Sequence, residues 1–311
     1  MRIALIGQAA FGEAVFRALR DAGEEIVAVS SVPGAPGRPD PLWAAAEQAR
    51  IPAFPTGSLK KSGVLDAFAA TKPDLGVMAF VTHILPERIL DLPLRGTVQY
   101  HPSLLPRHRG IHAMHWALRM GDDKTGLTVF WVDGGIDTGP ILLQREVDVS
   151  PDDTVGSLYF DRLFPMGVEA MVEAVRLVRE GNAPRLPQDE ARATYEPPTG
   201  DANSAILWSQ PARDVYNLIR GSNPTPGAHA RLHGERIRIF EARMTPGDAA
   251  AASGTVVAVE PDRIDIALNG GTLHAHRLQR DGAKKLPASD FAVAANVHPG
   301  DTFEDGRSDP A

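Results

Sequence analysis

The first half of the chain alternates short apolar runs with amphipathic segments, and this alternation restricts the folds available to it. Runs of strand length occur at residues 3–6, 26–30, 75–80 and 96–100. Segments with helical periodicity lie between them, at residues 11–21, 41–49 and 64–70. Strands that alternate with helices are typical of an α/β fold with a mostly parallel sheet.

The rest of the chain changes in pattern twice. Two further strands, 127–132 and 140–147, flank a glycine-rich turn, and a long helix over 153–180 is expected to be interrupted or kinked at Pro165. Residues 183–203 are rich in Pro, Gly and polar residues, which predicts a linker. A short helix at 211–220 then precedes alternating runs that predict a small β-barrel, OB-like in class, with strands at 236–241, 254–259, 264–268 and 272–278. Residues 300–309 are expected to be frayed.

We therefore expect a Rossmann-like catalytic domain with its linker over residues 1–200 and a C-terminal β-barrel domain over 201–311.

The sequence contains no run of about 18 apolar residues, so no membrane span is expected. With no cysteine, the chain has no disulfide and no thiol chemistry. The first apolar run is too short for a signal peptide, which favours the cytoplasm. The net charge of −7 does not favour binding to a phosphate backbone.

Two motifs that could bind cofactors are weak. The sequence GQAAFG at residues 7–12 follows a strand and precedes a helix, but it lacks the middle glycine of a dinucleotide fingerprint, so a turn without a nucleotide is expected. His108, His112 and His115 would align on one helix and suggest zinc, but Gly110 disfavours a continuous helix there. His274 and His276 alternate on an expected strand and are interpreted as incidental. No metal site is predicted.

His101 and Asp137 are stronger candidates for chemistry. His101 ends an expected parallel strand, where open α/β sheets bind their ligands, and Asp137 lies between glycines that allow a ligand close to the backbone. From the residues alone the pair is either structural or functional. A triad of Ser103, His101 and Asp137 is conceivable, but the Gly-x-Ser-x-Gly turn that exposes such a serine is missing.

The segments around these two residues closely resemble the folate-dependent formyltransferase family. HPSLLPRHRG at 101–110 is followed by WVDGGIDTG at 131–139, and Asp137 stands 36 positions after His101. LFP at 163–165 and APRLPQ at 183–188 are most similar to the hydrolase domain of 10-formyltetrahydrofolate dehydrogenase. IRG at 219–221, PGA at 226–228 and KLPASDF at 285–291 resemble both that domain and methionyl-tRNA formyltransferase. The resemblance covers about residues 1–292.

The resemblance implies a role for each matching residue. His101 would be the catalytic histidine, and Asp137 would orient it and manage protons. Family members that transfer the formyl group carry Asn two residues before the histidine, where this chain has Gln99. The folate would be bound at two segments, namely His83, Ile84 and Leu85, and Ser103, Leu104, Leu105 and Pro106.

The implied formyl donor is 10-formyltetrahydrofolate, and neither a metal nor a nucleotide is required. Hydrolysis to tetrahydrofolate and formate is the preferred interpretation. Transfer to a small amine, transfer to methionyl-tRNA and a catalytically inactive folate-binding module are the alternatives. From Ala205 to Ala311 there are 12 Lys and Arg against 13 Asp and Glu, a net charge of −1. Because a tRNA-binding barrel should have a basic face, we expect tRNA not to be a partner.

Overall fold

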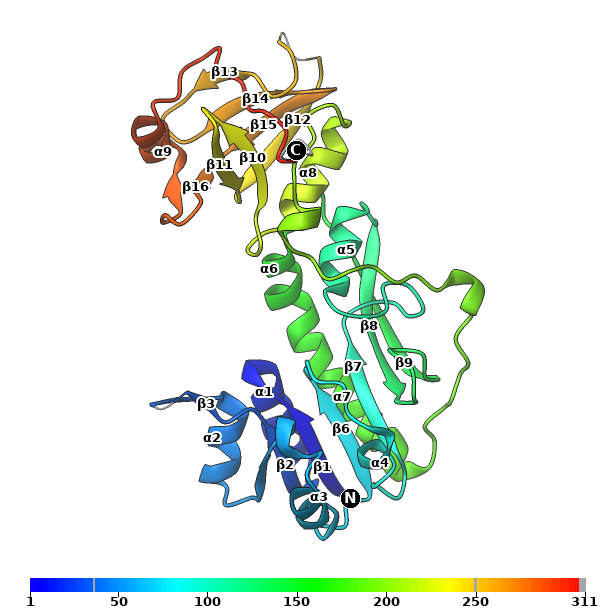
Figure 1. Ribbon diagram of the computed structural model, residues 1–311. Coiled ribbons are helices and arrows are strands. Elements are labelled where there is room, and N and C mark those ends of the chain that lie inside the picture. The colour runs from blue at the N-terminus through cyan, green and yellow to red at the C-terminus, as the bar shows by residue number, and fades with distance from the viewer. Residues whose placement is uncertain (36, 249–250, 308–311) are drawn as a thin grey trace. The chain divides into compact units, whose positions relative to one another are not determined.

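The computed structural model describes residues 1–35, 37–248 and 251–307 (Figure 1). The chain forms two compact units, neither of which is one continuous segment. The first unit comprises Met1–Gly110, Gly126–Val147 and Phe160–Tyr195, and the second comprises Ile111–Thr125, Asp148–Tyr159 and Glu196–Ala311. The boundary expected at residue 200 stays a prediction about independently folding domains.

The first unit contains a seven-stranded, mostly parallel sheet, as the sequence predicted. Its strand order is β5-β2-β1-β6-β7-β8-β9. The five strands from β5 to β7 are parallel, and β8 is antiparallel to β7. The bounds are β1 (Arg2–Gly7), β2 (Glu25–Ser31), β5 (Ala53–Pro55), β6 (Leu75–Ala79), β7 (Thr97–His101), β8 (Lys124–Trp131) and β9 (Ile141–Asp148).

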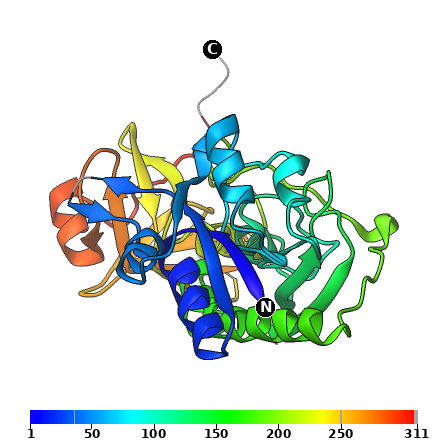
Figure 2. The same ribbon diagram turned by 90° about the horizontal axis from the view of Figure 1, so that it is seen from below.

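Helices cover both faces of this sheet, which explains why its central strands are apolar throughout. The helices α1 (Ala9–Asp21), α2 (Pro41–Gln48) and α7 (Phe164–Glu180) pack on one face around residues such as Leu5. The helices α3 (Ser62–Ala69) and α4 (Glu87–Leu90) pack on the other face around Ile6. Figure 2 shows the sheet between these two layers. A two-strand hairpin, β3 (Gly34–Ala35) with β4 (Arg38–Pro39), precedes α2.

The turn between β1 and α1 is held by Asp40, the residue before α2. Its carboxylate accepts hydrogen bonds from Ala9 N at 2.7 Å, Ser31 Oγ at 3.0 Å and Leu42 N at 2.9 Å. A Cβ on Gly7 would lie 2.3 Å from the carbonyl oxygen of Ala79, so this glycine is needed for packing between strands. Asp40 therefore already binds a backbone N–H at the start of α1.

The long helix expected over 153–180 is confirmed for residues 155–180, with the interruption near Pro165 that the sequence predicted. It consists of a short helix, α6 (Val155–Leu158), then a π-helical turn at Tyr159–Leu163, and then α7. Pro165 lies in the first turn of α7, directly after the π-helical turn. A local change of the hydrogen-bond pattern at this point accommodates the missing N–H of the proline.

The expected linker at 183–203 is wrong for residues 186–195, which we call the strap. Leu186 forms a β-bridge with Ile141, and their backbone hydrogen bonds are 2.8 and 3.0 Å long. At the other end of the strap, Arg109 N donates to the carbonyl of Thr194 at 3.0 Å. The strap therefore pairs with the first unit near both of its ends, and it contains a 3-10 helical turn at Glu190–Arg192 between them.

The second unit is built from helices and antiparallel strands around one apolar core, which confirms the expected antiparallel β structure after residue 200. One sheet has the order β10-β11-β16-β17 and the other β12-β15-β14-β13. The strands are β10 (Ala228–Leu232), β11 (Glu235–Ile239), β12 (Ala242–Pro246), β13 (Val256–Val259), β14 (Ile264–Leu268), β15 (Gly271–Ala275), β16 (Arg277–Arg280) and β17 (Leu286–Pro287). The helices are α5 (Ala113–Arg119), α6, α8 (Ala212–Arg220) and α9 (Ala288–Ala295).

Two details of this unit differ from expectation. The run expected as one strand at 272–278 breaks at His276, between β15 and β16, which belong to different sheets. Residues 300–307, expected to be frayed, are ordered because Phe303 is buried and Glu304 pairs with Arg231. Residues 308 and 309 lie outside the described part of the chain. Among the described residues, no helix is long and apolar enough to span a bilayer.

Candidate active site

His101 and Asp137 lie together, buried in the first unit. Their exposed fractions are 4% and 7%, and His101 Nδ1 is 3.5 Å from Asp137 Oδ2. His101 ends the parallel strand β7, as expected. Strand direction alone would not bring Asp137 to the edge of the sheet where His101 lies. The strand β8 is antiparallel to β7, and its last residue, Trp131, pairs with Val98 near the start of β7. The loop after β8 must fold back along β7 to bring Asp137 to the histidine.

The imidazole of His101 is fixed by the loop that follows β7. Its Nε2 lies 2.8 Å from the carbonyl oxygen of His108, and a carbonyl can only accept, so Nε2 carries a hydrogen. In the neutral ring, Nδ1 then has the free lone pair and faces Asp137. This arrangement leaves Nδ1 as the atom that can exchange a proton with a carboxylate or a ligand.

The carboxylate of Asp137 is oriented by two hydrogen-bond donors. Gly110 N donates to Oδ2 at 2.7 Å, and the side-chain amide of Gln99 donates to Oδ1 at 3.3 Å. Asp137 itself has φ +56°, a left-handed conformation that a residue with a side chain rarely adopts. The three predicted catalytic residues, His101, Asp137 and Gln99, are therefore in contact with one another through Asp137.

The backbone conformation of Asp137 is supported by the strap. The amide of Gln188 donates to the carbonyls of Asp137 and Gly139, both at 2.8 Å, and the hydroxyl of Tyr195 donates to the carbonyl of Ile136 at 3.0 Å. Sequence reasoning missed these residues. The only signal was the APRLPQ segment, whose role could not be known without its contacts.

Arg109 connects the strap to the loop after β7. Its side chain is buried and donates to Gln188 Oε1, from Nη2 at 2.8 Å and from Nε at 3.1 Å. It also forms a two-pronged ion pair with Glu190, at 2.6 and 2.9 Å. The hydrogen bond that Arg109 donates to Glu190 raises the pKa of Arg109, although burial opposes it. The same hydrogen bond lowers the pKa of Glu190.

The predicted folate-binding residues differ in exposure. The segment His83, Ile84 and Leu85 follows β6, which is parallel to and adjacent to β7, so it starts from the same edge of the sheet as His101. Ile84 is 79% exposed and is available to a ligand, whereas Leu85 packs in the core. The folate-binding role of this segment stays a prediction.

The second predicted folate-binding segment forms the base of the loop after β7. Leu105 and Pro106 are buried, and Leu104 is partly exposed. The hydroxyl of Ser103 is buried and donates to the carbonyl of Arg107 at 2.7 Å. Ser103 therefore stabilises the loop and is not presented to His101 as a nucleophile, which makes the Ser-His-Asp triad wrong. Binding of folate by these four residues stays a prediction.

The three histidines proposed to align on one helix do not do so. His108 and His112 both have left-handed backbones, with φ +57° and +69°, and α5 begins only after His112. His115 is partly buried, and its Nδ1 lies 2.9 Å from the carbonyl oxygen of Gly221. Burial lowers the pKa of His115 to about 4, so it is neutral at pH 7. Within residues 1–35, 37–248 and 251–307, no group of three His, Asp or Glu side chains is arranged to hold a metal.

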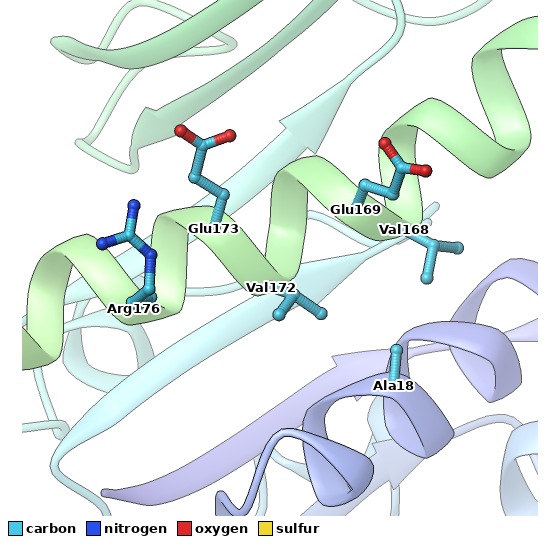
Figure 3. A pocket seen from close by; sticks show the side chains of 6 residues that line it. All are labelled: Ala18, Val168, Glu169, Val172, Glu173 and Arg176. Atoms are coloured by element: carbon cyan, nitrogen blue, oxygen red, sulfur yellow. The ribbon is translucent and has the colours of Figure 1, made fainter.

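A shallow groove between α1 and α7 is separate from this site (Figure 3). Two of its residues, Glu169 and Glu173, form ion pairs with Arg145, at 3.0 and 2.7 Å. The groove is lined by Ala18, Val168, Glu169, Val172, Glu173 and Arg176 and includes none of the predicted site residues.

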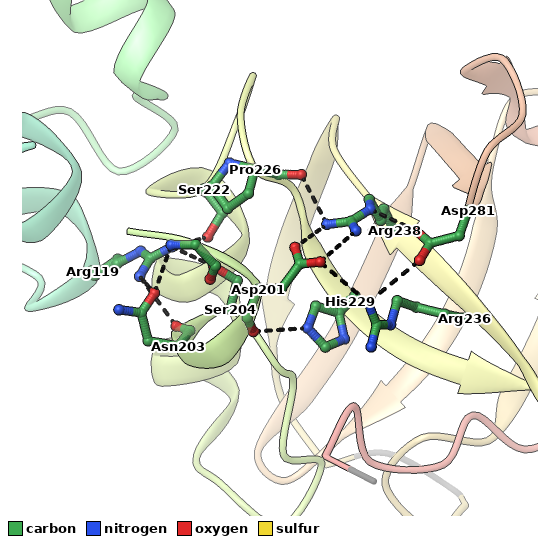
Figure 4. Close-up of polar contacts among 11 residues, drawn as sticks. Arg119, Asp201, Asn203, Ser204, Ser222, Pro226, His229, Arg236, Arg238 and Asp281 are labelled. Atoms are coloured by element: carbon green, nitrogen blue, oxygen red, sulfur yellow. Dashed lines mark hydrogen bonds and ion pairs between the residues drawn. The ribbon is translucent and has the colours of Figure 1, made fainter. Parts of the chain in front are cut away.

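The basic residues on β11 of the second unit are neutralised within that unit (Figure 4). Arg238 contacts Asp201 at 2.6 Å and Asp281 at 2.8 Å, and Arg236 contacts the same two carboxylates at 3.1 and 3.4 Å. The hydrogen bond from Arg238 lowers the pKa of Asp201. Lys285 donates to the carbonyl of Pro224 and lies 3.5 Å from the ring centre of Phe240. These cations are already paired.

Comparisons with known proteins agree on one family. A family model described as Formyl transferase matches residues 1–175, and one described as Formyl transferase, C-terminal domain, matches residues 200–296. The mitochondrial 10-formyltetrahydrofolate dehydrogenase of Mus musculus is 40% identical over 310 residues, covering 96% of this chain and 34% of that protein. The methionyl-tRNA formyltransferase of Moorella thermoacetica is 38% identical, covering 97% and 98%. The chain thus spans about a third of the length of the dehydrogenases it matches.

Solved structures show the same fold. An N-formyltransferase from Helicobacter canadensis, in complex with folinic acid and dTDP-3-aminofucose, aligns with a TM-score of 0.70 at 15% identity, covering 89% of this chain and 98% of that one. HypX from Aquifex aeolicus, in complex with tetrahydrofolic acid, aligns with a TM-score of 0.67 at 20% identity, covering 94% and 47%. At these identities the likeness establishes the fold alone.

Proposed function

The chain belongs to the formyl transferase family, and we propose that it hydrolyses 10-formyltetrahydrofolate to tetrahydrofolate and formate. The observation that carries this proposal is the hydrogen bond from the Gln99 amide to Asp137 Oδ1. That amide is turned to the carboxylate and is thereby less available as a donor to a formyl oxygen. A carboxylate held beside an imidazole suits activation of a water molecule.

The proposed chemistry needs only proton transfers between these side chains and the substrate. Asp137 accepts a proton from water as the water oxygen bonds to the formyl carbon. His101 Nδ1, when protonated, donates to the developing negative charge on the formyl oxygen. The bond between the carbon and N10 then breaks as N10 takes the proton held by Asp137. The carbon leaves as formic acid, which loses its remaining proton to solvent and becomes formate. No step requires a metal or a nucleotide.

Transfer of the formyl group to methionyl-tRNA is the second candidate. It is supported by the 38% identity with a methionyl-tRNA formyltransferase that aligns over nearly its whole length. The charge of the chain argues against it, since the net charge is −7 and the arginines of β11 are paired with Asp201 and Asp281. We therefore place water ahead of tRNA as the formyl acceptor.

One assay separates these functions. The protein is incubated with 10-formyltetrahydrofolate alone, with a small primary amine, or with charged initiator tRNA, and formate and tetrahydrofolate are measured. Formate equal to tetrahydrofolate without an added acceptor is expected for hydrolysis. Tetrahydrofolate that forms only with tRNA or an amine, without formate, would overturn the proposal. No turnover under any condition, with folate still bound, would identify a binding protein.

A further inference from the structure

Three hydrogen bonds hold Asp137 in its left-handed conformation. Their acceptors are the backbone carbonyl oxygen of Asp137 and those of residues before and after it. Gln188 binds the carbonyl oxygens of Asp137 and Gly139, and Tyr195 binds that of Ile136. A backbone that is unfavourable for a residue with a side chain persists only where its surroundings determine it. These three bonds all come from the strap, which is separated from Asp137 by about fifty residues of sequence.

The orientation of the Gln188 amide is fixed by Arg109. Both Nε and Nη2 of this buried guanidinium donate to Gln188 Oε1, so the amide oxygen must face the arginine. The amide nitrogen must then face the two carbonyls, which accept its two hydrogens. Glu190 binds the remaining side of the same guanidinium, so Arg109 cannot turn away without losing an ion pair.

The same block of residues also positions the carboxylate of Asp137. Gly110, the residue after Arg109, donates its N–H to Asp137 Oδ2, the oxygen that faces His101. The backbone and the side chain of Asp137 are therefore both tied to the Arg109–Gln188 pair. Errors of about 1 Å in the placement of a reacting group can lower a rate on the order of a hundredfold.

We propose that Gln188 is a positioning residue for Asp137, which it holds at the distance from His101 that formyl removal requires. This inference rests on the proposed function of the His101–Asp137 pair. It assigns Gln188 no contact with substrate. Its effect on turnover acts through Asp137 and leaves folate binding unchanged.

Gln188→Glu tests this role in the full-length protein. The change keeps the size of the side chain and an oxygen for Arg109, but replaces the donor to two carbonyls with a second acceptor. Folding should be retained because Arg109 gains a charged partner. We expect kcat for loss of the formyl group to fall at least tenfold, with KM for 10-formyltetrahydrofolate within twofold of wild type. The matched control is Gln279→Glu, in which an amide of the second unit that donates to a backbone carbonyl is changed in the same way.

A double variant separates positioning from a general structural effect. In an Asp137→Asn background, Gln188→Glu should lower the residual rate by less than twofold, because Gln188 acts through the lost carboxylate. A tenfold fall in the residual kcat in that background would overturn the proposal. So would a rise in KM for 10-formyltetrahydrofolate as large as the fall in kcat. If Gln188→Glu unfolds at a lower temperature than Gln279→Glu, Gln188→Met replaces it. Its kinetics are then compared with those of Gln279→Glu at a temperature where both variants are folded.

Failure of the positioning role is distinct from failure of the proposed function. The rate is followed as tetrahydrofolate formed, with whichever acceptor the wild type uses. An active wild type with an unaffected Gln188→Glu variant would refute the positioning role alone. A wild type that produces no formate, but whose transfer activity falls in Gln188→Glu, would refute hydrolysis and support the positioning role.

Discussion

At the residue scale, the proposed chemistry rests on the contact between an imidazole and a carboxylate. His101 Nδ1 and Asp137 Oδ2 are 3.5 Å apart, and the outer atoms of both groups, His101 Nε2 and Asp137 Oδ1, are hydrogen-bonded to other groups. Each side chain can therefore change its protonation state with little movement. Catalysis by such a pair is expected to be cooperative, because neither member is useful without the other.

We predict that His101→Ala and Asp137→Asn each lower formyl turnover at least a hundredfold. Folate affinity should stay within a few-fold, since neither group is needed to hold the ligand. The double variant should lose little more than either single variant. Steady-state kinetics with a calorimetric binding measurement tests this. A double variant whose loss is the product of the two single losses would show that the residues act independently.

We predict that Gln99→Asn raises transfer relative to hydrolysis when an amine is present. The asparagine amide is one carbon shorter, so it should withdraw from Asp137 Oδ1 and become available beside His101. The measurement is the ratio of formylated amine to formate at equal amine concentration, compared with wild type. An unchanged ratio would indicate that Gln99 already donates the same hydrogen bond that Asn would, and would remove the main reason for preferring water.

His115 should make stability depend on pH below 7. Burial lowers its pKa from 6.5 to about 4 in the folded protein, so folding favours the neutral ring. The stabilisation is complete above pH 6.5 and is lost as pH falls from 6.5 toward 4. It amounts to about 3 kcal/mol at most, since each pKa unit is worth about 1.4 kcal/mol. His115→Gln should flatten this dependence in urea unfolding, whereas the change His298→Gln at an exposed histidine should not. Parallel curves for wild type and His115→Gln would contradict the assignment.

At the element scale, single polar residues fix how the ends of helices and strands meet. Asp40 caps α2 through Leu42 N and also binds Ala9 N at the start of α1, so one carboxylate connects the first two helices. Arg109 has a comparable role, since it ties the loop after β7 to the strap.

We predict that Asp40→Ala lowers the free energy of unfolding by about 2–4 kcal/mol. Loss of a helix cap costs about 1 kcal/mol, and a buried N–H without a partner costs about 1–3 kcal/mol more. Urea unfolding followed by circular dichroism gives the value. The control is Asp66→Ala, a change at an exposed position on α3, which should alter stability by less than about 0.5 kcal/mol. Equal losses in the two variants would show that Asp40 does not connect the helices.

At the scale of the whole molecule, charge bears most directly on the choice of partner. The chain carries 39 acidic against 32 basic side chains, and its basic pair on β11 faces carboxylates of its own unit. A phosphate backbone would have to compete with Asp201 and Asp281 for these arginines. Membership of the family leaves tRNA among the possible acceptors, so the affinity of the chain for tRNA must be measured.

We predict that initiator tRNA binds with a dissociation constant above about 1 μM at physiological salt, as for non-specific binding. Asp201→Asn combined with Asp281→Asn should tighten binding and steepen its salt dependence, because two arginines are released. Fluorescence anisotropy with labelled tRNA, and a methionyl-tRNA formyltransferase as the positive control, provides the measurement. Submicromolar, strongly salt-dependent binding by the wild type would restore tRNA as the acceptor.

Local sequence patterns predicted the strands at the centre of the sheet and the two residues that we place at the centre of the candidate site. Short apolar runs predicted β1, β2, β6 and β7 to within two residues at each end, because strands that are buried on both faces are apolar along their length. The segments around His101 and Asp137 were identified because their residue types at that spacing resemble one family. Cytoplasmic location stays a prediction, as does the folate-binding role of His83 to Leu85.

Tertiary structure alone decided what holds that pair in place. The strap was expected to be a linker because its composition lacks periodicity, yet Gln188, Glu190 and Tyr195 support the Asp137 loop. The loop after β8 reaches His101 only by folding back, which depends on β8 being antiparallel to β7. Such contacts join residues some fifty to eighty positions apart. No local pattern encodes them, since they depend on backbone groups that every residue possesses and on a chain path that packing determines.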